Sequence, residues 1–417
     1  MRTPMRDCGG TYAGHLALAR IALLALGGCL TAIAAPSGQS NWQDVIRNLR
    51  HPDPDIRLKS TQQLGAAGYV AAAEPVAALI LDPDDRVQAA AIEAELGFFM
   101  IDRAGPTRIL GFGGSRSAAQ EAFEAGPLLR AAPVAPAVII DRLIAAMRDE
   151  NARIRFDAVH ALGAIAEPPL PASQVTALAE ELDHYDPIIR AATARVLARL
   201  RAAEAIDKLV ASLADSSVLV RQFSVEALGV IGADPAAKPL LSLLAEGRGA
   251  IPAQALLALA RIGHAPSRTE FRNRLNDRDP LMRRAAAEGL GRLADRESLE
   301  TLQNLQARDR ADEVRLAAAF AVDRLGEPQT HVLAAHLILR DVGPQARDYL
   351  LEIGRPSLAG IRATLEVAKD HRHRADLVHL IGFVGTRDEI SWLETFLADR
   401  DERVRRAAAD AIARLKR

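Results

Sequence analysis

One arrangement of apolar and polar positions recurs along the chain at intervals of about 31 residues. Four clear copies span residues 147–166, 213–232, 275–294 and 397–416, and the second of them reads LADSSVLVRQFSVEALGVIG. In each copy an acidic residue is followed six positions later by an arginine, and an aliphatic residue precedes that arginine. Another aliphatic residue stands seven positions after it. A fixed period of this length predicts a repeat architecture.

The arginine position, called position zero below, can be followed through eleven repeats. Positions −1, +3, +4 and +7 relative to it lie on one side of a helix. In the repeat around Arg221 these positions hold Val220, Ser224, Val225 and Leu228, so this side is the predicted core. The eleven residues at position zero are Arg57, Gln88, Arg155, Arg190, Arg221, Pro252, Arg283, Arg315, Arg347, Arg374 and Arg405.

Each repeat predicts two helices joined by a short turn. The acid lies in the turn, the second helix begins just before position zero, and Gly or Pro marks the connection to the next repeat. Neither helix can bury its apolar side alone, so the repeats must stack in a row. We expect the acid to cap free N–H groups of the second helix and the arginine to pair with the acid of its own or the neighbouring repeat. This structural ladder comprises Asp149, Arg155, Asp215, Arg221, Asp277, Arg283, Asp309, Arg315, Asp399 and Arg405.

These features resemble the HEAT repeat family, specifically the short HEAT-like repeats of bilin lyases, over residues 44–417. The resemblance rests on the repeated acid and on the aliphatic–arginine pair that opens the second helix. It implies an all-α fold, a right-handed α-α superhelix (α-solenoid) of about eleven HEAT-like helix pairs. Gln88, Pro252 and His373 depart from the pattern. The expected organisation is a first group of repeats at 44–96, an interruption at 97–138 and a longer array at 139–417.

The interruption is visible as a gap of 67 residues between positions 88 and 155. It contains GFFMIDRAGPTRILGFGGSRS from residue 97 and PVAPAV at 133–138. Two interpretations are open: a functional insertion, or a degenerate repeat or loop between two half-arrays.

The N-terminal segment has the order positive, apolar, small that is typical of a secretory signal. Its mainly apolar stretch between Arg20 and Pro36, residues 21–35, is fifteen residues long, whereas a membrane-spanning helix needs about 20. In one alternative, residues 1–34 form a signal peptide that is cleaved after Ala34. In the other, LGGC at 26–29 resembles the bacterial lipobox, so that residues 1–28 are removed and Cys29 carries a lipid. The chain is therefore expected to be exported, as a periplasmic protein or as a membrane-anchored lipoprotein.

Composition restricts the chemistry available to the folded part. The two cysteines both lie within the first 29 residues, so no disulfide, Cys-ligated metal or thiol nucleophile is available after them. Residues 1–28 contain three arginines and one aspartate; without them the 52 basic and 53 acidic residues become 49 and 52. A net charge of −3 disfavours a general nucleic-acid binder. Aromatic residues are 4% of the chain, so the core must consist mainly of aliphatic side chains packed helix on helix.

No motif indicates catalysis or a cofactor. The glycine-rich stretch at 111–115 lacks the lysine of a P-loop. Asp370, His371, His373 and His379 lie close in sequence, but without the i, i+4 histidine pair of a helical zinc site. We therefore predict no catalytic residue, no metal site and no cofactor, and we expect the chain not to be an enzyme.

Positions +1 and +5 of the second helices fall opposite the core, and in the family that the chain resembles they line the concave surface. Several of them are apolar where solvent is expected. Exposed apolar residues in a groove suggest a protein or peptide partner, unless flanking helices or the interruption cover them. The predicted partner-binding residues are Phe156, His160, Leu257, Arg284, Leu316 and Phe320.

The sequence thus predicts an exported scaffold or adaptor protein that binds a protein or peptide partner on its concave face. A few apolar anchors among charged positions are the expected means of binding. The alternative, implied by the resemblance, is a bilin-lyase-like protein that handles a tetrapyrrole. No nucleic-acid partner is expected, and membrane association enters only through the lipidated form of the N-terminus.

Overall fold

The chain divides into two units, residues 1–40 and residues 41–417. The computed structural model describes residues 42–100, 117–126, 133–246 and 249–416. The predicted signal segment and Cys29 lie outside the described residues, as does the glycine-rich stretch at 111–115. The interruption at 97–138 is described only at its two ends and at residues 117–126.

The described residues form twenty-three α-helices, supplemented by short 3-10 segments, with no strand among them. The predicted all-α solenoid of eleven helix pairs is confirmed. One helix, α5 (Ala118–Ala125), stands outside the pairs. The pairs are α1 (Trp42–Asn48) with α2 (Pro54–Ala67), α3 (Ala73–Ala77) with α4 (Asp85–Phe99), α6 (Ala137–Ala146) with α7 (Ala152–Ile165), α8 (Ala172–Glu180) with α9 (Pro187–Leu200), α10 (Ile206–Ala211) with α11 (Val218–Ile231), α12 (Ala237–Glu246) with α13 (Ile251–Ile262), α14 (Arg268–Arg274) with α15 (Pro280–Arg292), α16 (Leu299–Arg308) with α17 (Asp312–Arg324), α18 (Thr330–His336) with α19 (Gly343–Ile353), α20 (Leu358–Val367) with α21 (His371–Val384), and α22 (Ile390–Glu394) with α23 (Glu402–Lys416).

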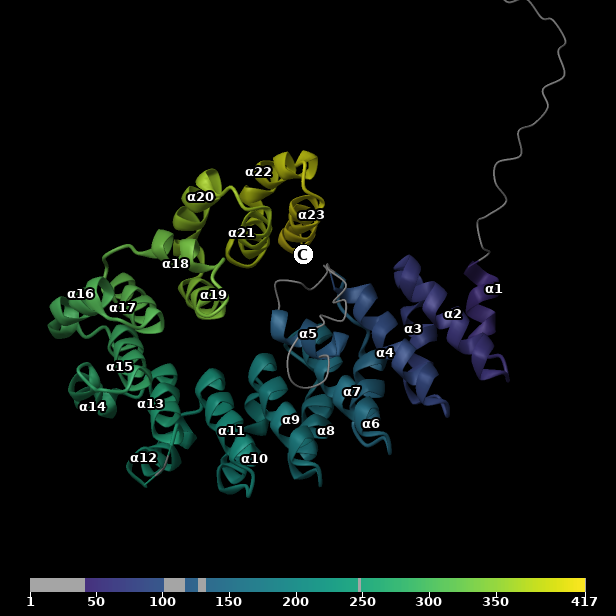
Figure 1. Ribbon diagram of the computed structural model, residues 1–417, viewed down its shortest axis with the longest axis horizontal. Helices are drawn as coiled ribbons and strands as arrows, with labels where there is room; N and C mark the ends of the chain where they lie inside the picture. Colours follow the sequence, from purple (N-terminus) through teal and green to yellow (C-terminus); the bar gives the residue numbers. More distant parts are fainter. Residues whose placement is uncertain (1–41, 101–116, 127–132, 247–248, 417) are drawn as a thin grey trace, which may run out of the picture. The chain divides into compact units, whose positions relative to one another are not determined.

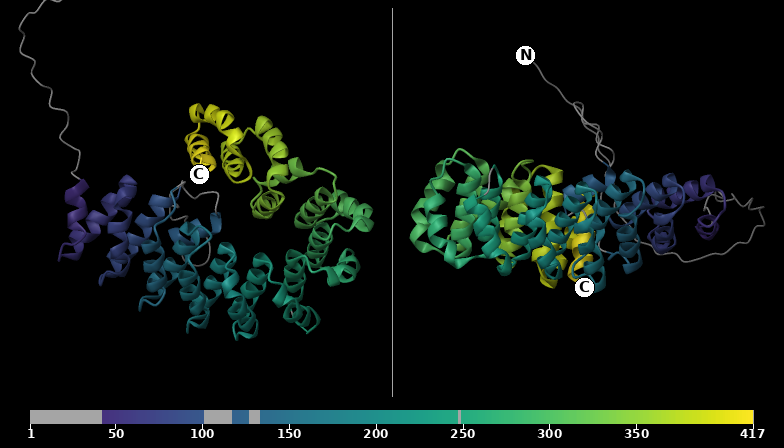
Figure 2. Two further views of the ribbon diagram at one scale, coloured as in Figure 1. Left: turned by 180° about the vertical axis from the view of Figure 1, so that it is seen from behind. Right: turned by 90° about the horizontal axis from the view of Figure 1, so that it is seen from below.

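The pairs follow one another as a row with two layers. First helices such as α10, α12 and α16 form the outer layer, and second helices such as α11, α13 and α17 form the inner layer (Figure 1). Views from behind and from below show the same row (Figure 2). The core lies between the layers, where Leu162, Leu197, Leu228, Leu259 and Leu290, all at position +7, have no exposed surface.

The arginine at position zero ties each repeat to the next. In α15, Nη1 of Arg283 donates to the backbone oxygens of Asp277 and Arg278 in its own turn, at 2.9 and 3.2 Å. Its Nε and Nη2 donate to the two carboxylate oxygens of Asp309 in the following repeat, both at 2.8 Å. The predicted contact between neighbouring repeats is therefore present. Equivalent contacts link Arg57 with Asp82, Gln88 with Asp149, Arg155 with Asp186, Arg190 with Asp215, and Arg374 with Asp399.

The prediction that the turn acid caps the second helix is wrong, because the N-cap is the residue two positions after that acid. Asp82 accepts a hydrogen bond from the backbone N–H of Asp84 at 2.9 Å, and Asp84 is itself the N-cap of α4, accepting from Arg86. Where histidine replaces the acid, Nδ1 of His51 or His184 accepts the same kind of bond at 3.0 Å. A short side chain with an acceptor at this position is sufficient to close the turn.

The ladder has local exceptions. Pro252 offers no side-chain donor, and Asp277 in the next turn instead accepts from Arg274 of its own repeat at 3.0 Å. The remaining ladder residues Arg221, Arg315 and Arg405 donate to carbonyl oxygens of their own turns.

Successive second helices approach most closely at position +8, which is often glycine. A Cβ atom on Gly291 of α15 would lie 2.6 Å from Cα of Ala321 on α17, a distance that real Cβ atoms do not show. Gly65, Gly229 and Gly382 face alanine of the next second helix in the same way, with their nearest atoms at 2.7 to 2.9 Å. The absence of a side chain at position +8 therefore sets the spacing of the inner layer.

The row loosens where position +8 is not small. Leu96, Asp323 and Arg355 occupy it in the repeats that end with α4, α17 and α19. At the first of these places α4 still contacts α7 and α5 packs against both, and at the others α19 contacts α17 and α21 only sparsely. Position zero of α19, Arg347, accordingly lies outside the ladder and donates to the backbone oxygen of Ala125 at 3.1 Å.

We predict that Gly291→Ala destabilises the chain, although alanine is the better helix former by about 1 kcal/mol. The new methyl group would force α15 and α17 apart, and such overpacking costs about 1–3 kcal/mol. The free energy of unfolding, measured by urea titration with circular dichroism, is expected to fall. Asn304→Ala, at an exposed position of α16, is the matched control and is expected to leave stability unchanged or slightly higher. A stabilised Gly291→Ala variant would contradict the role of position +8.

Candidate partner-binding surface

The inner face of the second helices is the candidate site, and three regions of it differ in character. The N-terminal pocket lies between α2, α4 and α5. The α5 site consists of His160, Gly163, Arg195, Arg199 and Arg347, which contact α5. The charged cluster surrounds one buried glutamate between α15 and α19.

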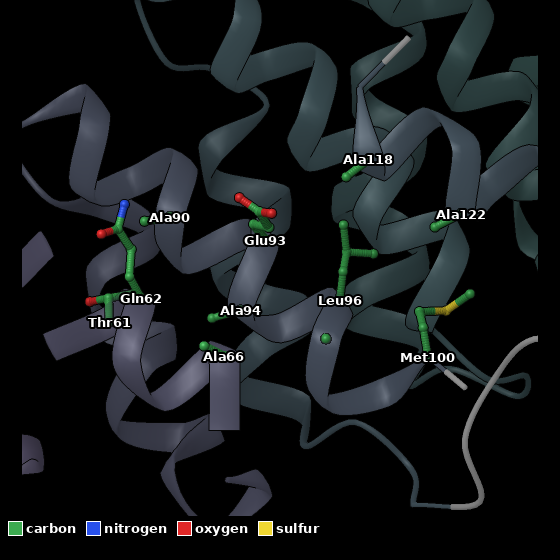
Figure 3. A pocket seen from close by; sticks show the side chains of 12 residues that line it. Thr61, Gln62, Ala66, Ala90, Glu93, Ala94, Leu96, Met100, Ala118 and Ala122 are labelled. Carbon is green, nitrogen blue, oxygen red and sulfur yellow. The ribbon is translucent and has the colours of Figure 1, made fainter. Parts of the chain in front are cut away.

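The N-terminal pocket has a volume of about 270 Å³. Gln62 of α2, Glu93 of α4 and Ala118 of α5 face it from three sides (Figure 3). Its size lies just below the usual range for small-molecule sites, so it suits a side chain of a partner better than a large cofactor. Most of its wall consists of small residues, namely Gly65, Ala66, Ala90, Ala94, Gly97, Ala118 and Ala122.

Glu95, also on α4, occupies the core position +7 that leucine fills in other repeats. Its side chain is fully buried, and neither carboxylate oxygen has a hydrogen-bond partner. Burial raises the pKa of Glu95 well above its usual value. The buried, unpaired carboxyl therefore destabilises this repeat. Glu95 is not among the residues that line the pocket.

In the α5 site, the ring of Phe123 contacts two guanidinium groups. The Arg199 group is 3.8 Å and the Arg195 group 4.7 Å from the centre of its ring, and His160 meets the ring edge-on at 5.5 Å. Gly163 leaves the space for the ring, because a Cβ there would lie 2.5 Å from it. This arrangement combines an apolar contact with cation–π attraction.

The C-terminal end of α5 is held by three arginines. Arg199 donates to the backbone oxygen of Phe123, and Arg347 donates to that of Ala125 at 3.1 Å. Glu124 pairs with Arg195 at 2.8 Å. Positive side chains complement the negative end of a helix dipole, so the site recognises the end of a helix as well as its aromatic residue.

The expectation that His160 is available to a partner is wrong, because α5 covers it. Its Nδ1 pairs with the backbone oxygen of Phe156 at 2.8 Å, and its side chain is buried. Burial lowers the pKa of His160, so the ring is neutral near pH 7. Phe156 is half-buried against the same ring.

The charged cluster fastens α19 to α15. Oε1 of Glu288 accepts from the Tyr349 hydroxyl at 2.6 Å and from Arg284 at 3.0 Å, and Oε2 accepts from Arg292 at 2.8 Å. Burial alone would raise the pKa of Glu288, but Arg292 and Arg284 outweigh it and lower the pKa to about 2. Arg292 also donates two hydrogen bonds to the carboxylate of Glu352, at 2.9 and 2.8 Å. Glu288 is therefore ionised and fully paired.

For Leu316 and Phe320 two alternatives were open, exposure to a partner or cover by a flanking helix, and the structure shows that they are covered. Both are buried, and Phe320 stacks on Tyr349 of α19 with ring centres 4.4 Å apart. The covering helix is α19, which contacts α17 and whose Tyr349 donates to Glu288 of α15. Of the other predicted partner-binding residues, Leu257 is half-buried, and Arg284 is partly exposed while pairing with Glu288.

The histidines near residue 371 have structural contacts. Asp370 is the N-cap of α21, accepting from the backbone N–H of His373 at 2.8 Å, and Nε2 of His373 lies 3.0 Å from the backbone oxygen of Ala334. Within the described ranges, no group of three or more His, Cys, Asp or Glu side chains could hold a metal ion. In the same part of the chain, no helix combines the length and apolar character needed to cross a bilayer.

The stacked pairs, the ladder and the inner face define an α-solenoid. Residues 175–251 and 240–323 match the family model described as HEAT repeats. The described residues as a whole form an α-solenoid, and the part that matches the HEAT repeat model is residues 175–323. No curated protein matches the chain in sequence.

Solved structures similar to the chain include an engineered protein, 16% identical, with 90% of this chain and 99% of that one covered at a TM-score of 0.35. The complex of CpcE and CpcF of phycocyanin lyase from Nostoc sp. PCC7120 is 19% identical, covering 66% and 94% at a TM-score of 0.36. Karyopherin Kap121p, bound to the extreme C-terminus of the protein phosphatase Cdc14p, is 13% identical, covering 92% and 46% at 0.38. At these TM-scores the similarities carry no information on what the present chain binds.

We predict that Glu95→Leu stabilises the chain increasingly as the pH rises. The pKa of Glu95 is higher in the folded state than in the unfolded state. Below the unfolded-state pKa of about 4.3 the carboxyl is protonated in both states. As the pH rises above that value, the unfolded state releases its proton first, and the folded state becomes less stable relative to it. Above that pH the variant is expected to gain at least about 1 kcal/mol in free energy of unfolding, since an unpaired buried polar group costs about 1–3 kcal/mol. Urea titrations between pH 4 and 8 measure the difference. Glu93→Leu, on the exposed side of α4, is the control; equal pH profiles for both variants would refute the assignment.

Proposed function

We propose that this protein is an exported scaffold or adaptor that binds a protein or peptide partner on its inner face. The observation that supports the proposal is that this face already holds a polypeptide segment, α5, which is not part of the row. The contacts are those of peptide recognition: a buried aromatic anchor, arginines on backbone oxygens, and an ion pair.

Beside the α5 site, α11 and α13 offer further accessible surface. Gln222 and Leu257 are partly exposed and Glu226 is exposed, all at positions +1 or +5. One apolar residue among polar ones suits an interface with an apolar centre and a polar rim. The N-terminal pocket extends the same face towards α2.

The proposed role involves no catalytic step. Glu288, the most deeply buried member of the charged cluster, has partners on both oxygens, and with its pKa near 2 it holds no proton to donate near neutral pH. Its contacts serve to fix α19. Export, to the periplasm or to the membrane through Cys29, rests on the order of residue types in residues 1–35.

We predict that a partner captured from periplasmic and membrane extracts by the tagged full-length chain is lost when the inner face is altered. Glu226→Lys reverses an exposed charge on α11, and at least a tenfold decrease in captured partner is expected. Glu300→Lys makes the same change on the exposed side of the outer helix α16 and should leave capture unchanged. Quantitative mass spectrometry of the eluates measures both. Equal capture by the two variants would contradict binding on the inner face.

A further inference from the structure

We propose that the α5 site is a binding site for a helix of the partner whose last turn carries an aromatic residue followed by an acidic one. In this view α5 is an internal occupant, with Phe123 and Glu124 as that pair, and the partner helix replaces it. The inference rests on the proposed function, because it names the chemistry of the partner for the same face.

The site is built independently of α5. Its residues on α7 and α9 are placed by the row: Leu162 and Leu197 are fully buried in the core, and Arg155 and Arg190 bind acids of the following turns. By contrast, α5 has eight residues, and an isolated helix of that length is marginal in water. The row therefore orients the residues of the site on α7 and α9, and α5 packs against them through Ala119, Ala122 and Phe123.

The contacts select an aromatic residue. Two guanidinium groups lie over the faces of the Phe123 ring at 3.8 and 4.7 Å, which is the geometry of cation–π attraction. Gly163 provides the depth that a ring needs. A cationic side chain in this position would be repelled by Arg195 and Arg199.

The contacts also select an acid and a helix end. Arg195 binds the carboxylate that follows the ring, while Arg199 and Arg347 bind backbone oxygens of the last turn. When α5 leaves, three guanidinium groups lose these partners. The vacant site is then positively charged and attracts an acidic helix terminus in preference to a basic one.

Because α5 is attached to the same chain, it competes at an effective concentration of the order of millimolar. A free segment of the same sequence consequently binds the intact protein weakly. Replacing Phe123 weakens the competition by α5, so the measured affinity of a free peptide approaches the intrinsic affinity of the site. This difference makes the inference testable without knowledge of the natural partner.

The test uses a fluorescein-labelled peptide with the sequence SAAQEAFEAG, residues 117–126, and fluorescence anisotropy. The full-length Phe123→Ala variant is expected to bind the peptide at least tenfold more tightly than the unaltered chain. A peptide with alanine in place of its phenylalanine should not bind. The double variant Phe123→Ala/Gly163→Ala fills the space for the ring and should lose binding at least tenfold again.

Phe123→Leu is a second variant for the case that Phe123→Ala does not fold, since it keeps an apolar side chain in the site. Its affinity for the peptide is expected to lie between those of the unaltered chain and of Phe123→Ala. Circular dichroism and thermal unfolding establish folding. If the folded variants bind the peptide no better than the unaltered chain, the inference is wrong. If both variants unfold, α5 belongs to the core and the inference is equally wrong. A partner whose capture depends on Glu226 would still support the proposed function in either case.

Discussion

The close approach of successive second helices is the constraint on which the rest of this structure depends. Glycine at position +8 lets one helix backbone contact alanine of the next, as between Gly291 and Ala321. In the same pair of repeats, the position-zero arginine Arg283 reaches the acid one repeat further on, Asp309. Packing and polar contacts thus favour the same alignment of one repeat against the next. The inner layer can then bind other segments.

One helix outside the pairs, α5, packs on the inner face, and α19, the second helix of its pair, is bound there by side-chain contacts to α15. Leu96 and Asp323 at position +8 cannot support the close contact, and near these positions α5 and α19 are found on the inner face. Each is fixed through side chains of the row, α5 through Phe123 and α19 through Tyr349. A loosened repeat therefore provides both the room and the accessible side chains for binding another helix.

The helix pairs, their turns and the core could be predicted from the sequence, because these features depend on residues within one repeat or its neighbour. Leu228 at position +7 is an example. The burial of Phe320 could not be predicted, since it depends on the ring of Tyr349 and on the bond between Tyr349 and Glu288, 61 positions apart. The role of Phe123 was missed for the same reason: its partners lie on α7 and α9. The residues at position +8 could have indicated where the close packing of second helices is interrupted, since Asp323 and Arg355 stand in a series of small residues.

If the row of second helices is stable in itself and α5 is a segment bound to it, α5 opens more readily than the row. Amide hydrogen exchange of the full-length chain, followed by mass spectrometry, tests this most directly, because bound segments open without unfolding the scaffold. The account predicts that the amides of α5 exchange at least tenfold faster than those of α7 and α9. Exchange of all three helices at one common rate would contradict it.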